Sequence, residues 1–364
     1  MNFTDFSQKH KDEISSFVEM SHIAGARADY VQGGGGNTSV KMDDLMAIKA
    51  SGFRFNQIEK DDGYAVLNYK NVLGFYNDTD PSTLDDVDKA GSAKAAENVI
   101  FIEGFKQLRP SVEVGFHSLL GKYVLHTHSI YANFFTCSDC GPVLVEHALE
   151  GLGKAWCMVP YTNPGAVLTF DINRILADKE AETGKRPSII FLMNHGVVVT
   201  GDTAEETIRL HDEVNERLAA AFGVKISDFA EPKIKPCPCG NGTLVSDTPW
   251  LWDRLKGGAF DAERLEINAL YPDQLVFLTD SVEYRIKDDG TPCEKPCTIF
   301  SETGRVRYNT TEAKALTIEQ TLVALALIYE TVEKAGYNIV PMSAAGKDFI
   351  SNWESEKYRK SLGN

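Results

Sequence analysis

The stretch 124-VLHTHSIYAN-133 decides the fold of this chain, because it places two histidines inside an apolar run. The run predicts a buried β-strand, in which residues i and i+2 point to the same face. The imidazoles of His126 and His128 should therefore project side by side from one sheet surface. Such a pair suits a metal ion, which needs several nitrogen donors at about 2 Å, but it also suits two histidines that only hydrogen-bond on a solvated face.

A second apolar stretch, 188-SIIFLMNHGVVVTGD-202, predicts a strand, a tight turn and a strand, with His195 and Gly196 at the turn. A side chain at such a turn can be aimed at a neighbouring strand. Three neutral imidazoles that leave positions open are typical of a catalytic zinc site rather than a structural one. His126, His128 and His195 are therefore candidates for one metal site.

A carboxylate and a fourth histidine lie just before the histidine strand. Pro110 and Ser111 predict the start of a helix that carries Glu113 and His117 and leads into that strand. Glu113 would serve either as a fourth metal ligand or as a general base. His117 lies on the same helix face, four residues on. We expect His117 to support the site or to hydrogen-bond within the core, rather than to bind metal.

Two loops are candidates for holding an anion, 33-GGGGNTS-39 and 49-KASG-52. Four glycines cannot lie cheaply in a helix or a strand, so the first stretch predicts a loop that enters a strand. Backbone N–H groups, an amide and hydroxyls at such turns can cradle an anion. Each loop alone is a weak signal, since most glycine-rich loops are simple turns. The first loop lacks the dinucleotide-binding fingerprint, because the G-x-G-x-x-G spacing is absent.

The remaining pattern predicts two domains, 1–230 and 231–364, because proline and glycine concentrate in 231-EPKIKPCPCGNGT-243. The first domain should contain helices over 5–28, 83–108, 168–179 and 203–222. The second is predicted to be a smaller α/β domain of unknown role, with strands over 274–279, 297–300 and 304–308 and helices over 317–335 and 344–361.

Seven scattered cysteines do not resemble the disulfide framework of a small secreted protein. Cys237, Cys239, Cys293 and Cys297 would form a structural zinc site or remain loop thiols. Neither spacing is the common C-x2-C pair and no histidine lies near, so loop thiols are the simpler interpretation.

Composition limits the classes of function that remain. The chain has 364 residues, 43% of them hydrophobic, and a formal net charge of −15. So acidic a protein is a poor general binder of nucleic acid phosphates, although a local pocket can hold one anionic metabolite. We find no signal peptide and no apolar run near the ~20 residues that span a membrane. We therefore expect a cytoplasmic protein with neither nucleic acid nor membrane as a partner.

Six motifs, taken in order, resemble the class II aldolase/adducin family over residues 10–225: GGGGNTSVK, KASG, PSVE, HTHSIYA, VPYTNPGAVL and NHGVVVTGDTAEETIRLHDEV. The chain looks closest to the aldolase part of bifunctional rhamnulose-1-phosphate aldolase/dehydrogenase proteins. A weaker likeness to a segment that follows the aldolase unit there extends to 353-WESEKYRK-360. The resemblance implies a three-layer αβα domain with a mainly antiparallel central sheet, followed by the smaller C-terminal domain.

The same resemblance implies a role for each matching position. It implies zinc ligation by His126, His128 and His195, and acid/base catalysis by Glu113. Lys49 and His117 would support the site. One departure is Val112, where the fuculose-type enzyme has a serine that contacts phosphate. The positions that match phosphate contacts are Gly36, Asn37, Ser51, Gly52 and Ser111.

The implied reaction is reversible retro-aldol cleavage of a ketose phosphate to dihydroxyacetone phosphate and an aldehyde, through an enediolate whose charge zinc would hold. A pentulose-phosphate 4-epimerase, a decarboxylase and a non-catalytic adducin-like scaffold are alternatives. The resemblance also implies a homo-oligomer, a tetramer.

Overall fold

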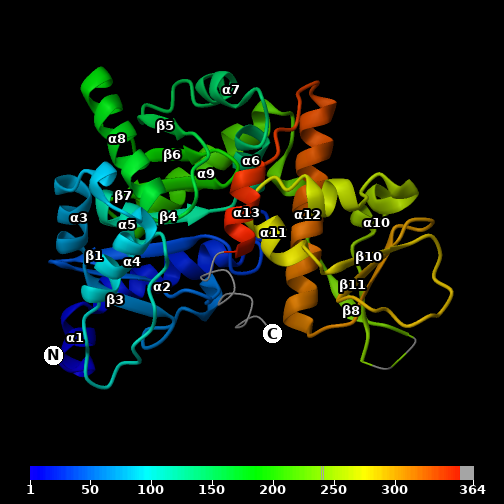
Figure 1. The fold of residues 1–364 in the computed structure, drawn as a ribbon, viewed down its shortest axis with the longest axis horizontal. Coiled ribbons are helices and arrows are strands. Elements are labelled where there is room, and N and C mark those ends of the chain that lie inside the picture. Colours follow the sequence, from blue (N-terminus) through cyan, green and yellow to red (C-terminus); the bar gives the residue numbers. More distant parts are fainter. Residues whose placement is uncertain (239, 241, 353–364) are drawn as a thin grey trace. The chain divides into compact units, whose positions relative to one another are not determined.

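The structure is a computed structural model that describes residues 1–238, 240 and 242–352 (Figure 1). The chain forms two compact units that interleave along the sequence. Unit 1 contains Met1–Arg27, Gly34–His128 and Leu149–Asn215, and unit 2 contains Ala28–Gly33, Ser129–Ala148 and Glu216–Asn364. The sequence predicts one cut at 230/231 instead, and that domain boundary stays a prediction. Cys239 and the predicted helical residues after 352 lie outside the described residues.

Unit 1 is built on a seven-stranded sheet with the strand order β3-β2-β1-β4-β7-β6-β5. All neighbouring strands pair antiparallel except β5 and β6, which are parallel. The predicted mainly antiparallel sheet is therefore confirmed. The strands are β1 Asn37–Met42, β2 Leu45–Lys49, β3 Tyr64–Asn68, β4 Tyr123–Thr127, β5 Trp156–Val159, β6 Ile189–Leu192 and β7 Gly196–Gly201.

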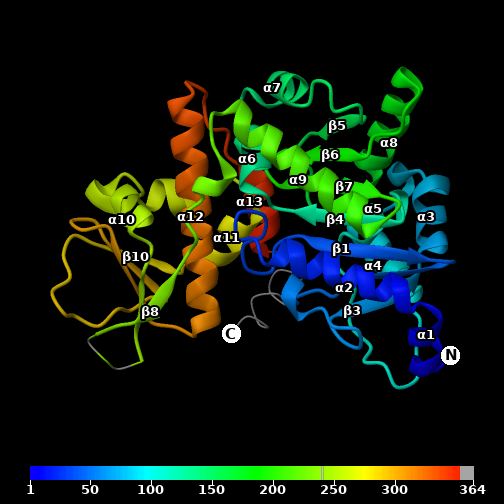
Figure 2. The ribbon, with the colours of Figure 1, turned by 180° about the vertical axis from the view of Figure 1, so that it is seen from behind.

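Helices cover both faces of this sheet, as the two opposite views show (Figures 1 and 2). α2 and α9 lie on one face, and α3, α4, α5 and α8 lie on the other. The helices are α1 Phe3–Lys9, α2 Lys11–Gly25, α3 Tyr69–Asp78, α4 Val87–Glu97, α5 Val114–Leu119, α8 Ala166–Thr183 and α9 Ala204–Ala221, with 3₁₀ turns at Phe55–Gln57 and Pro81–Thr83. The part of α9 from Glu216 onward belongs to unit 2. The expected helix over 5–28 is in fact two helices that meet at His10, and the stretch 83–108 is helical only over α4.

An apolar core lies between the sheet and the second helix layer. Phe116 on α5, Leu67 on β3 and Ile190 on β6 are each 0% exposed within it. Each such side chain stabilises the fold by about 1.5–3 kcal/mol relative to an exposed one. This packing holds α5 against the sheet, and therefore also fixes the position of Glu113, the N-cap residue of α5.

Unit 2 has its own five-stranded sheet, with the order β10-β11-β12-β9-β8. Its strands are β8 Ile234–Pro236, β9 Leu244–Ser246, β10 Val282–Arg285, β11 Cys297–Phe300 and β12 Arg305–Tyr308. Its helices are α6 Ile130–Thr136, α7 Gly141–Ala148, α10 Pro249–Leu255, α11 Pro272–Leu278, α12 Glu312–Lys334 and α13 Ala344–Asn352, with short turns at Ile226–Asp228, Lys256–Gly258 and Glu263–Ile267. The predicted strands over 297–300 and 304–308 are confirmed by β11 and β12.

The predicted strand over 274–279 is wrong, because residues 274–278 belong to helix α11 and Thr279 is its C-cap. A short apolar run fits a buried helix as well as a buried strand. Pro272 stands in the first turn of α11, where its missing N–H costs nothing. That proline was the local signal in favour of a helix.

Among the described helices, α12 is long and apolar enough to cross a membrane by length and composition alone. The expectation that no segment approaches membrane length therefore needs this correction. Within unit 2, however, 78% of its apolar window is buried. It packs against α6, α10 and α11, which is the behaviour of the core helix of a soluble domain.

Candidate metal and carboxylate site

Three buried histidines converge in unit 1. His126 lies in β4, His128 follows the end of that strand, and His195 lies in the turn between β6 and β7. Their ring centroids are 5.1 Å apart for His126–His128, 5.0 Å for His126–His195 and 4.8 Å for His128–His195. The possible ligand atoms all lie within 4.8 Å of one another. Three imidazole nitrogens gathered in this way are the donor set of a catalytic zinc site.

Two glycines let neighbouring backbone approach β4 closely enough to form this cluster. A Cβ on Gly196 would lie 2.2 Å from the carbonyl oxygen of Thr127, and one on Gly36 would lie 2.3 Å from that of His126. Gly36 also has a φ of 68°, in the left-handed region. Larger residues would push the His195 turn and the start of β1 away from the histidine strand.

The orientation of His126 suits a metal ligand. Its Nδ1 lies 3.1 Å from the carbonyl oxygen of Val197, which can only accept a hydrogen bond. Nδ1 therefore carries the proton, and Nε2 presents a lone pair toward the cluster. This arrangement, in which a backbone carbonyl fixes the tautomer, is common for ligating histidines.

Glu113 lies at the N-terminal end of α5 and is 5% exposed. Its Oε1 lies 3.4 Å from Nε2 of His195, and its Oε2 lies 3.6 Å from Nε2 of His126. Within the described part of the chain, Oε1 has no hydrogen-bond partner. A buried carboxylate without full compensation is costly, so a divalent cation beside it and the imidazoles fits the donor set. The structure therefore brings together the residues of the predicted metal and acid/base site.

His117 lies outside the three-histidine cluster. Its Nδ1 lies 2.7 Å from Oγ of Ser39, and its Nε2 hydrogen-bonds with Oδ1 of Asn37. Burial lowers the pKa of His117 well below its usual value, and the nearby charges of His126 and Lys41 act in the same direction. His117 is therefore a neutral imidazole at neutral pH.

The predicted phosphate-contacting residues also lie in adjacent segments of unit 1. Nδ2 of Asn37 donates to Oγ of Ser111 at 2.9 Å. An isolated bridge pairs Ala50 with Pro110, and the Ser51 N–H donates to the Arg109 carbonyl at 2.9 Å. The two loops are thus held backbone to backbone, which brings 49–52 beside 109–111.

Lys49 does not offer a simple phosphate contact. Its side chain is buried, and its Nζ donates to the carbonyl of Phe53 at 2.7 Å and lies 5.9 Å from the ring centroid of Phe55. The ammonium group therefore closes its own loop. Anion binding here would rely on hydroxyl and backbone donors more than on Lys49.

Two further residues of β1, Ser39 and Lys41, contact α5 and are not among the predicted site residues. Ser39 contacts His117, and Nζ of Lys41 donates to the carbonyl of Ser118 at 3.0 Å and to that of Leu120. The available signal was the alternation N-x-S-x-K in a predicted strand, which places three polar side chains on one face.

The cysteine alternative finds no support in the described residues. Cys293 and Cys297 carry free thiols, and among the described residues they belong to no group of three or more close ligands. Cys237 is disulfide-bonded, and Cys239 lies outside the described range.

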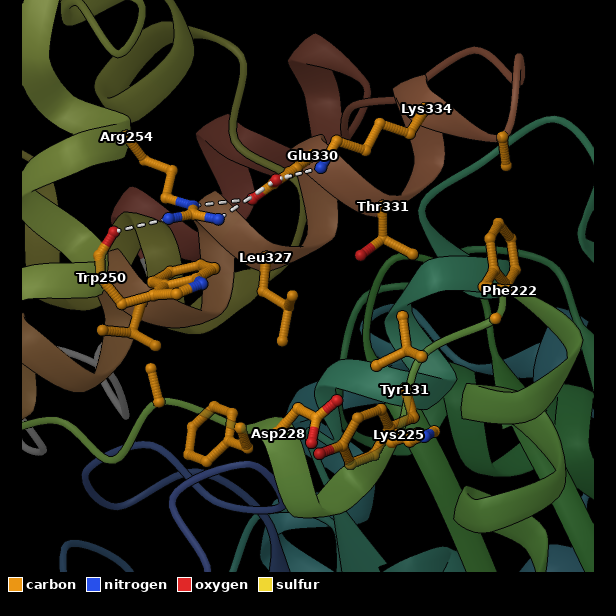
Figure 3. Close-up of a pocket in the computed structure, with 16 residues that line it drawn as sticks. Tyr131, Phe222, Lys225, Asp228, Trp250, Arg254, Leu327, Glu330, Thr331 and Lys334 are labelled. Carbon is orange, nitrogen blue, oxygen red and sulfur yellow. Dashed lines mark hydrogen bonds and ion pairs between the residues drawn. The ribbon is translucent and has the colours of Figure 1, made fainter.

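Unit 2 contains a separate cavity of about 390 Å³, which Figure 3 shows between α10, α12 and the segment after α9. Arg254 lies 4.1 Å from the ring centroid of Trp250 and pairs with Glu330 at 2.8 Å. Lys334 pairs with the same carboxylate. These charges compensate one another, and no predicted site residue lines the cavity.

Comparisons with known proteins cover the part of the chain that carries the site. Residues 16–222 match the class II aldolase and adducin N-terminal domain. A protein named L-fuculose phosphate aldolase from Methanococcus vannielii is 25% identical over 207 residues, which is 57% of this chain and 93% of that protein. Its namesake from Methanococcus maripaludis has the same identity and coverage.

Solved structures show a similar range. The N-terminal class II aldolase domain of a conserved protein from Thermoplasma acidophilum has a TM-score of 0.47 and 24% identity, covering 57% of this chain and 92% of that chain. YgbL from Klebsiella pneumoniae, described as an aldolase, an epimerase or a decarboxylase, has a TM-score of 0.40 and 21% identity, covering 58% of this chain and 89% of that chain.

Proposed function

We propose a retro-aldol function for this chain, which belongs to the class II aldolase/adducin family. The substrate would be a ketose 1-phosphate, cleaved reversibly to dihydroxyacetone phosphate and an aldehyde. The observation that carries the proposal is the buried carboxylate of Glu113 beside the convergent trio of His126, His128 and His195. Relatives named L-fuculose phosphate aldolase support the choice of reaction.

His126, His128 and His195 would hold a divalent ion, zinc by their all-imidazole donor set. When bound, such an ion supplies electrostatic stabilisation of the negative charge that develops next to the substrate carbonyl. The fixed tautomer of His126 and the burial of all three rings keep these donors oriented and largely free of water.

Glu113 would move the proton. Cleavage of the carbon–carbon bond leaves a carbon that must be protonated, and the new aldehyde forms as a hydroxyl loses its proton. The carboxylate is buried at the cluster, and Nδ2 of Asn37 donates to its Oε2 at 2.6 Å. That hydrogen bond fixes one oxygen, so the other can face the reacting atoms.

The phosphate end would be held by Gly36, Ser51, Gly52 and Ser111. The Asn37 amide would orient the Ser111 hydroxyl rather than contact the phosphate itself, because its two hydrogens bond to Ser111 and Glu113. Val112 removes one hydroxyl donor relative to the fuculose-type pattern. One hydrogen bond to a charged group is worth about 1.5–3 kcal/mol, or roughly ten- to a hundredfold in affinity. Weakened but retained phosphate binding follows from the donors that remain.

The identity of the sugar is also part of the proposal, and both fuculose 1-phosphate and rhamnulose 1-phosphate are candidate substrates. The likeness to bifunctional rhamnulose-type proteins is consistent with the second of these. 4-Epimerisation or decarboxylation would use the same glutamate and trio. An adducin-like scaffold would need neither a buried carboxylate nor converging imidazoles. A homotetramer in the cytoplasm completes the proposal, and sedimentation of the purified chain reports the number of subunits.

A coupled assay for dihydroxyacetone phosphate across a panel of ketose 1-phosphates tests this function. We expect turnover of at least one sugar, lost on chelation and restored by zinc, and slower turnover of its unphosphorylated form. Turnover of unphosphorylated or acid substrates alone would overturn the phosphate claim. If the zinc-bound protein cleaved no sugar in the panel, the aldolase assignment would be wrong and an epimerase, a decarboxylase or a scaffold would take its place.

A further inference from the structure

One face of β1 presents three polar side chains to α5. Asn37, Ser39 and Lys41 alternate along the strand and therefore point to the same side. Asn37 reaches Glu113 at the start of α5, Ser39 reaches His117 in its middle, and Lys41 reaches the carbonyls of Ser118 and Leu120 at its end. The strand thus fixes the short helix at three successive points.

A series of hydrogen bonds links Glu113 to Ser39 through Asn37 and His117, and only one assignment of donors and acceptors satisfies all of them. Nδ2 of Asn37 donates to Oε2 of Glu113 at 2.6 Å and to Oγ of Ser111 at 2.9 Å, which uses both of its hydrogens. The carbonyl Oδ1 of Asn37 must then accept from Nε2–H of His117. A neutral imidazole has one N–H, so its Nδ1 accepts from the hydroxyl of Ser39.

We propose that His117 is a positioning residue that locks the side-chain amide of Asn37, so that the NH₂ group faces Glu113 and Ser111. The inference rests on the proposed function for its catalytic consequence. An amide turned by 180° would place Oδ1 against the carboxylate, where two acceptors repel. His117 opposes that rotation because its Nε2–H can bond only to an oxygen.

Ser39 completes the lock. Without its hydroxyl, Nδ1 of His117 would be a buried acceptor with no donor, and the imidazole would gain by moving its proton to Nδ1. Nε2 would then present a lone pair to Asn37 and favour the turned amide. Ser39 therefore sets the tautomer from a position three hydrogen bonds away from Glu113.

A double-mutant cycle between His117 and Asn37 tests whether the imidazole acts through the amide. We expect H117F to lower kcat/KM by about ten- to a hundredfold, since small misplacements of catalytic groups are costly. H117Q, which keeps an N–H donor, should recover to within about tenfold of the parent. In the N37A background H117F should cause no further loss.

Ser118 offers a matched control, because within the described part of the chain its buried hydroxyl bonds to the carbonyl of Gly115, inside α5 itself. S118A should leave kcat/KM within about threefold, since it removes one local hydrogen bond outside the lock. The positioning role would be overturned if the losses of kcat/KM caused by H117F and N37A were additive in the double variant. It would also be overturned if S118A lowered kcat/KM as much as H117F does.

Histidine-specific ¹⁵N labelling of the metal-free chain gives a readout that needs no activity. The resonance that disappears in H117Q identifies His117. We expect this resonance to report a neutral Nε2–H imidazole between pH 6 and pH 8 in the parent, and the Nδ1–H tautomer in S39A. A charged or Nδ1–H imidazole in the parent would overturn the lock. A correct tautomer in a chain that cleaves no sugar phosphate would instead refute the proposed function alone.

Discussion

At the scale of single residues, Glu113 is the centre of the proposed site. It is the side chain that contacts His126, His195 and Asn37 together. Its role as a base can be separated from a role as a metal ligand by the isosteric amide. If it moves a proton, its loss should affect the rate far more than the metal content.

We therefore expect E113Q to keep its metal and its fold while turnover falls ~10²–10⁴-fold, the usual contribution of a general acid or base. The amide can still accept from Asn37, so the geometry should survive. Elemental analysis beside steady-state rates checks both halves. Glu97, exposed at the end of α4, provides the control variant E97Q. A fully active E113Q would require another base, and loss of metal would identify a ligand.

The histidine trio could be predicted from sequence because it depends on local rules. The strand period pairs His126 with His128, and the glycine turn aims His195 at their strand. The link from Asn37 to Glu113 and His117 could not be predicted, because it joins residues that are 76 and 80 positions apart. Only the pairing of β1 with β4, and the packing of α5 on β1, brings them together.

At the scale of elements, Lys41 ties β1 to the C-terminal end of α5. Burial lowers the pKa of Lys41 to about 7, and the charge of Arg186 acts in the same direction. Its ammonium donates to two carbonyls at the helix end, where a positive charge is favourable. Keeping this buried group charged nevertheless costs stability in the folded chain.

The sign of the resulting pH dependence is defined. Between pH 7 and the ordinary lysine pKa of 10.5, the unfolded chain binds the proton and the folded chain does not. Stability from Lys41 should therefore rise with pH across this window and be lost as pH falls through 7. The slope is at most about 1.4 kcal/mol per pH unit.

We expect the Tm of the parent to rise relative to K41M by a few degrees between pH 7 and pH 9, since ~1 kcal/mol shifts Tm by about 2–4 °C in domains of this size. Calorimetric scans of both proteins at each pH measure the difference. K60M, at an exposed lysine, should run parallel to the parent. If the Tm of K41M also changed with pH in parallel with that of the parent, Lys41 would be shown to stay charged between pH 7 and pH 9.

Element type was predictable where periodicity or caps were strong and failed where a run was short. Residues 274–278 lie in helix α11 although their apolar residues suggested a strand, because a run of four apolar residues has no period of its own. Strands β8 and β9 went unpredicted, because each has only three residues.

At the scale of the whole molecule, the two compact units exchange segments along the sequence. Ser129–Ala148 directly follows the histidine strand yet belongs to unit 2, where α6 packs against α12. Composition and loop signals cannot reveal such an exchange, because it depends on which distant helix covers a buried face. The family match ends at residue 222, so the role of the C-terminal residues is open to experiment rather than to analogy.

The proposed function depends on one divalent ion at His126, His128 and His195. Its most direct test is the zinc content of the purified chain, measured beside H128A and a control variant, H147A, at an exposed histidine on α7. We predict about one zinc per subunit in the parent and in H147A, and a several-fold loss in H128A with the fold retained. Equal zinc in all three proteins, or none in the parent after loading, would contradict the account.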